Sequence, residues 1–163
     1  MKIKSKALGI SLILIFCVGI FAGNLAGLWK TESSKTARVI NEGVYAGEKN
    51  PEDIKGSFSF SDIKNNFAIP EEVLRIAFGL DKVSDISAFK CKDLETYYGT
   101  AIDKEIGTGS MRLFVALYKG IDYDLTSDIY LPNTAVKLLK EKNNLTEVQL
   151  DYLKNHTVEI PLK

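Results

Sequence analysis

One uninterrupted apolar stretch near the amino terminus constrains this chain more than any other feature of its sequence. From Ala7 to Trp29 the only polar residues are Ser11 and Asn24. At 1.5 Å per residue, a helix of about 23 residues measures roughly 34 Å, which is enough to cross the hydrocarbon core of a bilayer with some tilt. We therefore expect residues 7–29 to form a transmembrane anchor in a lipid bilayer.

A cleavable signal sequence is the alternative to an uncleaved anchor. Cleavage needs small residues at the first and third positions before the cut. A cut after Ala22 would put Ile20 at the third position, and a cut after Ala26 would put Asn24 there. The residue before Cys17 is a bulky aromatic one, which also argues against a lipoprotein signal. These mismatches favour an uncleaved anchor.

The lysines around the apolar stretch predict its orientation. Three of them crowd the short tail before it, at Lys2, Lys4 and Lys6. The cations that follow it are more dilute, at Lys30, Lys35 and Arg38. The positive-inside rule then predicts that residues 1–6 are a cytoplasmic tail, that the remainder lies outside the cell membrane, and that Trp29 marks the outer interface.

Glycines recur every four residues within the apolar stretch, at Gly19, Gly23 and Gly27. This spacing gives two overlapping G-x-x-x-G motifs, whose smooth face lets another helix approach closely. Glycine is also common in membrane helices for general reasons, so composition alone is the alternative explanation. The register indicates a packing face for a second membrane helix, from another protein or from a second copy of this chain.

The rest of the chain reads as a polar linker followed by one domain. Residues 30–56 are polar and contain the breakers Gly43, Gly47 and Pro51, which indicate a stalk. Residues 57–163 are long enough for one domain and too short for two. The chain is 45% hydrophobic and 26% charged with a formal net charge of zero, which favours a globular domain and argues against nucleic acid as a partner.

Two helices are predicted at the start of this domain. Ser59 is a suitable N-cap with Asp62 at the N3 position, and the apolar residues that follow share one helical face: Phe60, Ile63 and Phe67. Pro70 is expected at the first position of the second helix, and Gly79 is expected to end it. The short connection at Ala68 predicts a helical hairpin.

The segment Thr108–Lys119 is the strongest predicted element. Its apolar residues surround the whole helix, which indicates burial on every side, and Gly120 is expected to end it. Further helices are predicted from Asp93, from Pro132 and from Thr146, which forms a capping box with Gln149. Residues 156–160 are expected to be extended. The predicted fold is therefore mostly all-α, with a buried central helix and at most short extended segments.

Catalytic and metal-binding groups do not cluster in the sequence. The single His156 cannot build a zinc site with one distant thiol, and Cys91 has no activating neighbour and is expected to be buried. A faint calcium-loop pattern at Asp122, Asp124 and Asp128 lacks the turn glycine and the terminal glutamate. We therefore expect no catalytic residues, no metal and no cofactor.

One weak binding motif remains. The run Gly107, Thr108, Gly109 and Ser110 precedes the central helix, so its backbone N–H groups could hold an anion, with Arg112 adding charge. The more ordinary interpretation is a helix cap beside a partly buried arginine that pairs with Glu105 or another carboxylate.

Several stretches together carry a family resemblance: "GLWKTESSK", "GVYAGEKNPEDIKGSFSFSDI", "FAIPEEVLRIAFGL", "KDLETYY", "EIGTGSMRLFVALYKGIDYD" and "YLPNTAVKLL". With them the chain resembles an uncharacterised group of prokaryotic single-pass membrane-anchored proteins. Its helical part is similar to C-terminal extensions of multi-span membrane proteins with iron–sulfur or haem partners. The resemblance implies an accessory role at a membrane, and the absence of a cysteine cluster or haem motif means that it implies no redox centre in this chain.

Two functions follow as hypotheses. The first is a non-enzymatic interaction module, tethered outside the membrane, that docks on a membrane protein complex. The second is an extracytoplasmic domain that binds a small anionic ligand between Gly107 and Arg112. An exposed apolar patch would favour the first hypothesis, and a closed pocket around Arg112 would favour the second.

Overall fold

The computed structural model describes residues 5–25, 35–99 and 104–160, and it divides the chain into two compact units, residues 1–34 and 35–163. In the first unit, helix α1 spans Ser5–Leu25. Among the residues described in full, no helix combines the length and the apolar character that crossing a membrane requires. Gly27, Trp29 and Lys30 lie outside the described residues, as does the tail of residues 1–4, and of Gly23 only the helical backbone is described.

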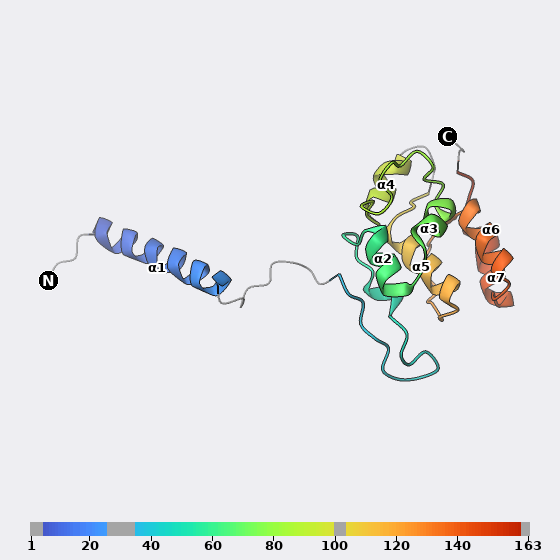
Figure 1. Cartoon of the computed structure of the whole chain (residues 1–163), viewed down its shortest axis with the longest axis horizontal. Coiled ribbons are helices and arrows are strands. Elements are labelled where there is room, and N and C mark those ends of the chain that lie inside the picture. The colour runs from blue at the N-terminus through green and yellow to red at the C-terminus, as the bar shows by residue number, and fades with distance from the viewer. Residues whose placement is uncertain (1–4, 26–34, 100–103, 161–163) are drawn as a thin grey trace. The chain divides into compact units, whose positions relative to one another are not determined.

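The second unit is mostly helical, as predicted. Its described residues form a short 3-10 turn, η1 (Pro51–Asp53), and six α-helices. These are α2 (Phe60–Phe67), α3 (Glu71–Ala77), α4 (Asp93–Tyr98), α5 (Thr108–Lys119), α6 (Asn133–Lys142) and α7 (Glu147–Asn155). Figure 1 shows α2, α3 and α6 in this order across the unit, and α3 contacts both of its neighbours.

The helix boundaries follow local capping chemistry. The Ser59 hydroxyl accepts a hydrogen bond from the Asp62 N–H, and the Asp62 carboxylate accepts one from the Ser59 N–H at 2.7 Å. The predicted N-cap with Asp62 at N3 is therefore present as a capping box. Thr146 and Gln149 form a second one before α7. Ala68 ends α2 in the left-handed region with φ 55°, which is an unusual backbone for alanine and closes the predicted hairpin. Pro70 occupies the N-cap of α3, one position earlier than predicted.

Helix α5 has the predicted bounds and lies in the core. Its side chains from Ser110 to Leu117 are at most 2% exposed, with the exception of Arg112. Phe114 and Phe78 pack edge to face with ring centroids 5.6 Å apart, and Phe60 also packs edge to face with Phe78, at 6.3 Å. These fully buried aromatic rings join α2, α5 and the end of α3 into one core.

The extended structure in this unit is brief. Strand β1 (Leu131–Pro132) pairs in parallel with β2 (Thr157–Val158), with Leu131 opposite Thr157. The predicted extended segment near the C-terminal end is therefore present. Pro132 closes β1 and caps α6, so it too lies one position before the helix that it was expected to begin.

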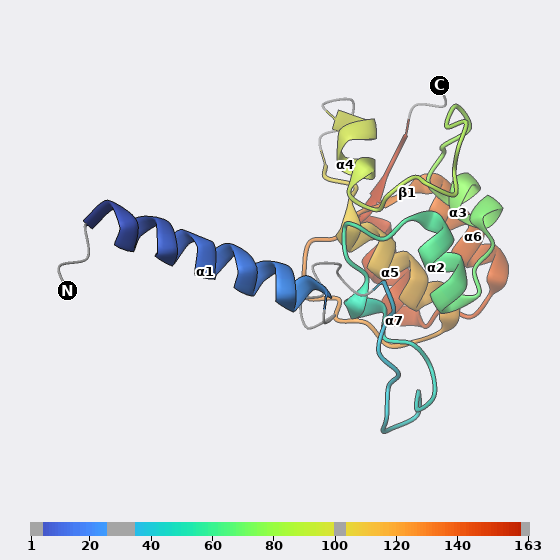
Figure 2. The same cartoon turned by 60° about the vertical axis from the view of Figure 1, so that its left-hand side comes forward.

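The main departure from the predicted organisation concerns residues 35–56, which we call the strap. We expected them to be part of a polar linker, but they pack on the second unit, where Ala37 and Ile54 are fully buried. The Asn66 side chain accepts a hydrogen bond from the Ala37 N–H at 2.8 Å, and Arg38 pairs with Asp53 at 2.8 Å. Part of the strap projects from the helices as a loop (Figures 1 and 2), with Val44 94% exposed.

Candidate functional site

The predicted anion site lies at the N-terminus of helix α5. Gly107 occupies the N-cap, and its N–H donates to the Ser110 hydroxyl at 3.2 Å. Ser110 is 2% exposed, so this hydroxyl is committed to the cap inside the protein. Thr108 and Gly109 follow as the first residues of the helix, and a Cβ atom added at Gly109 would lie 3.8 Å from the Ile129 side chain.

A carboxylate already lies beside this helix terminus. A Cβ atom added to Gly107 would lie 2.6 Å from the Glu95 carboxylate oxygen Oε1, so the glycine permits the close approach of Glu95. A negative side chain near the positive end of a helix is stabilising. The same charge repels a second anion, so the protein supplies its own anion at this position.

Arg112 is engaged in holding the strap. Its Nε donates to the Ile54 carbonyl at 2.8 Å, and its Nη1 lies 3.9 Å from the Glu52 carboxylate. The carboxylate partner is therefore Glu52, which fits the expectation of Glu105 or another carboxylate through its second option. Tyr123 shares Glu52, and burial together with this carboxylate raises the pKa of the Tyr123 hydroxyl. The N-terminus of α5 therefore forms a helix cap, and Arg112 pairs with a carboxylate beside it. This arrangement is the ordinary interpretation of the motif given above.

The described side chains of α1 form an exposed apolar surface. Ile13, Leu14, Ile15 and Phe16 are between 58% and 71% exposed. Because successive helical residues are about 100° apart, four consecutive side chains point to all sides of the helix. A Cβ atom at Gly19 would meet nothing within 4 Å, so this glycine leaves open space on its face.

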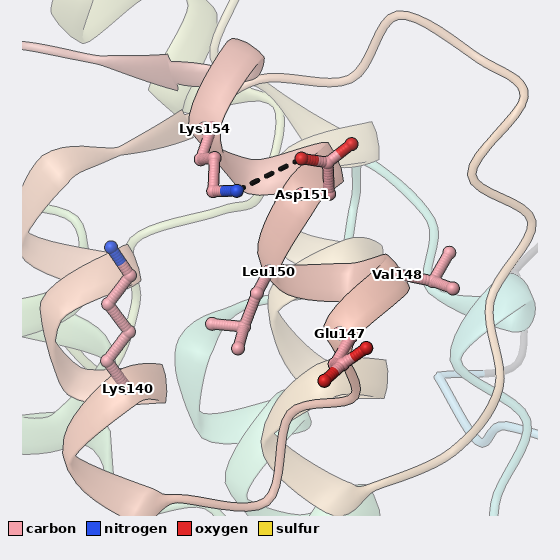
Figure 3. Close-up of a pocket in the computed structure, with 6 residues that line it drawn as sticks. All are labelled: Lys140, Glu147, Val148, Leu150, Asp151 and Lys154. Atoms are coloured by element: carbon pink, nitrogen blue, oxygen red, sulfur yellow. Dashed lines mark hydrogen bonds and ion pairs between the residues drawn. The ribbon is translucent and has the colours of Figure 1, made fainter.

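An open hollow lies on the second unit between α6 and α7. It has a volume of about 640 Å³ and is shown in Figure 3 with its lining residues: Lys140, Glu147, Val148, Leu150, Asp151 and Lys154. Lys154 pairs with Asp151 at 3.1 Å, and Val148 is 71% exposed. A second hollow of about 620 Å³ adjoins it and shares Lys140 and Lys154. Positive and negative groups alternate around both hollows, so neither presents a field of one sign.

The two side chains that most often carry chemistry are both engaged in packing. Cys91 is fully buried as predicted, and burial raises the pKa of its thiol to about 12, which keeps it protonated and unreactive near neutral pH. The His156 ring stacks on Tyr152 with centroids 3.8 Å apart. Among the described residues, no group of three or more potential ligands is placed to hold a metal ion.

Sequence reasoning did not find the α6–α7 hollow or the strap contacts. The hollow is formed by residues from two helices that carry ordinary surface composition, so no motif marks it. A signal for the strap was present in Ala37 and Ile54, two apolar residues within otherwise polar sequence. Comparison of the chain with protein-family models, with curated proteins and with solved structures gives no match.

Proposed function

We propose that the chain is a single-pass membrane protein whose N-terminal helix anchors a non-enzymatic accessory domain. In this proposal, residues 1–6 lie in the cytoplasm, residues 7–29 cross the cell membrane and the helical domain lies outside. The domain docks on a membrane protein partner, and the glycine face at Gly19, Gly23 and Gly27 contacts that partner or a second copy of the chain.

The observation that carries the proposal is the apolar surface on every side of α1. In water, such a surface costs about 25 cal/mol for each Å² that stays exposed, and lipid or another helix removes that cost. Residues 13–16, with exposures of 58–71%, are the described part of this surface. The length of the proposed span comes from the sequence, because several side chains near both ends of α1 lie outside the described residues.

The topology can be tested by labelling one exposed position. Val44 is 94% exposed on the strap, so a Val44→Cys variant presents an accessible thiol. Buried Cys91 contributes little background, and Cys17→Ser removes the remaining thiol. We expect a membrane-impermeant maleimide to label intact cells with an accessible cell membrane, and the protein to stay in the membrane after alkaline carbonate extraction.

Two outcomes would contradict this topology. Labelling that appears only after the membrane is permeabilised would place the domain in the cytoplasm. Release of the protein by carbonate would remove the anchor altogether. The same variant labelled after permeabilisation provides the control for total reactive thiol.

Docking on a partner has its own experiment. After mild detergent extraction, the full-length protein should migrate together with a multi-span membrane protein. Replacement of residues 7–29 by an unrelated apolar helix without the glycine spacing should loosen that complex, because close backbone approach is lost. A protein that migrates alone in both forms would contradict the accessory role.

The anionic-ligand alternative draws little support from the geometry at Gly107. Glu95 supplies a negative charge there, and Arg112 is held by the Ile54 carbonyl and by Glu52. A small anion such as phosphate should therefore not raise the unfolding temperature of the protein. A rise that the Arg112→Gln variant abolishes would favour this alternative over docking.

A further inference from the structure

His156 lies where three segments of the second unit meet. It caps the C-terminal end of α7 and directly precedes β2. Its backbone carbonyl accepts a hydrogen bond from the Leu131 N–H at 2.9 Å, at the start of β1. Its ring lies against the loop of residues 121–130, which connects α5 to β1, and its side chain is 17% exposed.

The two ring nitrogens both face hydrogen-bond acceptors. Nδ1 lies 2.8 Å from the Tyr152 backbone carbonyl, and Nε2 lies 3.3 Å from the Asp128 carboxylate. A carbonyl and an ionised carboxylate can only accept. Both nitrogens must therefore carry a proton for both contacts to be hydrogen bonds, and only the imidazolium form satisfies this requirement. A neutral ring that keeps the bond to Tyr152 turns a lone pair toward Asp128.

Aromatic rings and a helix C-terminus also surround the imidazole. The ring stacks on Tyr152 at 3.8 Å with an interplanar angle of 4°, and Tyr130 lies 5.2 Å away. Aromatic faces attract cations. The end of α7 carries the partial negative charge of a helix C-terminus, which also favours a cation.

We infer that His156 is a proton-operated latch that fastens the loop of residues 121–130 to helix α7. When the ring is protonated, the bond to Asp128 adds to the contacts that already hold the loop. When the ring loses its proton and keeps the bond to the Tyr152 carbonyl, the bond to Asp128 is lost. Tyr152 then remains as the second attachment through its hydroxyl, which accepts from the Ile129 N–H at 3.1 Å and donates to the Ser127 carbonyl.

Histidine is the side chain whose ordinary titration falls between pH 5 and pH 8, and His156 is the only histidine of the chain. The other ionisable groups around the ring are acids and phenols that belong to the loop and to α7, and one lysine above the Tyr130 ring. They are Asp124, Asp128, Tyr130, Tyr152 and Lys104. A change in the loop between pH 5.5 and pH 7.5 that is lost when His156 is replaced therefore reports on His156.

Hydrogen exchange of the full-length protein in detergent tests the latch. For residues 121–130, the protection factor is the intrinsic exchange rate of each amide divided by its measured rate. We expect these factors to be about twofold to fivefold higher at pH 5.5 than at pH 7.5, which is the range of a partly exposed ion pair. His156→Gln should abolish this difference. Asp128→Asn should reduce it sharply, and this side chain is 87% exposed, so the variant should fold normally.

Asp124→Asn is the matched control. Asp124 belongs to the same loop and accepts from the Thr126 N–H at 2.9 Å, but it makes no contact with the His156 ring. It should keep the full pH difference. Equal protection at the two pH values in the unmodified protein would overturn the latch, as would a pH difference that persists in both His156→Gln and Asp128→Asn. The inference does not depend on the membrane anchor or on the docking partner.

Discussion

At the scale of single residues, apolar side chains of the second unit range from fully buried to mostly exposed. Phe114 is fully buried and contacts the Phe78 and Tyr118 rings, whereas Val148 is 71% exposed at the edge of the α6–α7 hollow. Both residues are apolar, so their substitution separates burial from composition.

We predict that Phe114→Ala lowers the free energy of unfolding by about 3–5 kcal/mol, because it removes a large buried side chain and leaves a cavity. Val148→Ala should change it by less than about 0.5 kcal/mol. Chemical denaturation followed by far-UV circular dichroism measures both. Equal effects of the two substitutions would mean that α5 is not the centre of the core.

Cys91 gives a prediction that depends on pH. Burial raises the pKa of its thiol to about 12 in the folded protein, against about 8.5 for an exposed thiol. In a Cys17→Ser background, iodoacetamide at pH 8 should therefore modify the denatured protein and leave the folded protein largely unmodified. Because only the unfolded chain loses this proton between about pH 8.5 and pH 12, the stability contributed by Cys91 should fall as the pH rises through that window. Rapid modification of the folded protein would show that the thiol is accessible.

At the scale of elements, the strap shows how a polar segment can be held by a few apolar residues. Ile54 is fully buried, and η1 packs against α5. Arg38 makes a bidentate pair with Asp53, which lowers the pKa of that carboxyl, but the Arg38 side chain is 81% exposed. Arg38 and Asp53 both belong to the strap, so the burial of Ile54 attaches the strap to the helices, whereas this ion pair joins two parts of the strap to each other.

We predict that Ile54→Ala lowers the free energy of unfolding by about 2–5 kcal/mol. Arg38→Ala should lower it by a much smaller amount, because an ion pair with an exposed partner gains little in water. Thermal unfolding of the two variants under identical conditions distinguishes the contributions. A larger loss in Arg38→Ala would show that the ion pair within the strap stabilises the unit more than the burial of Ile54 does.

The glycine face of α1 gives the second prediction at this scale. Gly19→Ile should weaken association of the helix with its membrane partner, because a branched side chain prevents close backbone approach. Gly19 has open space around its Cβ position, so the helix itself can accommodate the change. Phe21→Ala alters the opposite face and serves as the control. Association can be measured by energy transfer in bilayers, and equal association of Gly19→Ile and the unmodified helix would make the glycines a matter of composition.

At the scale of the whole molecule, the boundary of the second unit has a measurable consequence. We predict that a fragment of residues 35–163 folds and that a fragment of residues 57–163 is less stable by at least about 3 kcal/mol, because it lacks Ala37 and Ile54 and leaves the Arg112 side chain without its carbonyl acceptor. Unfolding curves of both fragments measure the difference. Equal stability would restore residues 35–56 to the role of a linker.

Much of the helical organisation could be predicted because the signals are local. The capping boxes at Ser59 and Thr146 and the bounds of the central helix at Thr108–Lys119 are confirmed. Pro70 and Pro132 were each predicted at the first position of a helix, and each lies one residue before it, at the N-cap. The sequence does not separate these two positions, because a proline fits both of them. The candidate site was predicted less well. The backbone motif of the candidate site is present at Gly107. The charge at the site, however, depends on Glu95, which belongs to helix α4.

Sequence alone determined the features that depend on residues close to one another along the chain. These are the apolar N-terminal stretch, the helix starts and stops, and the burial of the central helix, because apolar periodicity and capping act within a few residues. The tertiary structure decided the pairing of Arg112 with Glu52, the burial of the strap and the convergence of His156 with Asp128. The partners in these contacts are separated by many residues, and local sequence patterns do not record which distant groups the packing of the core brings together.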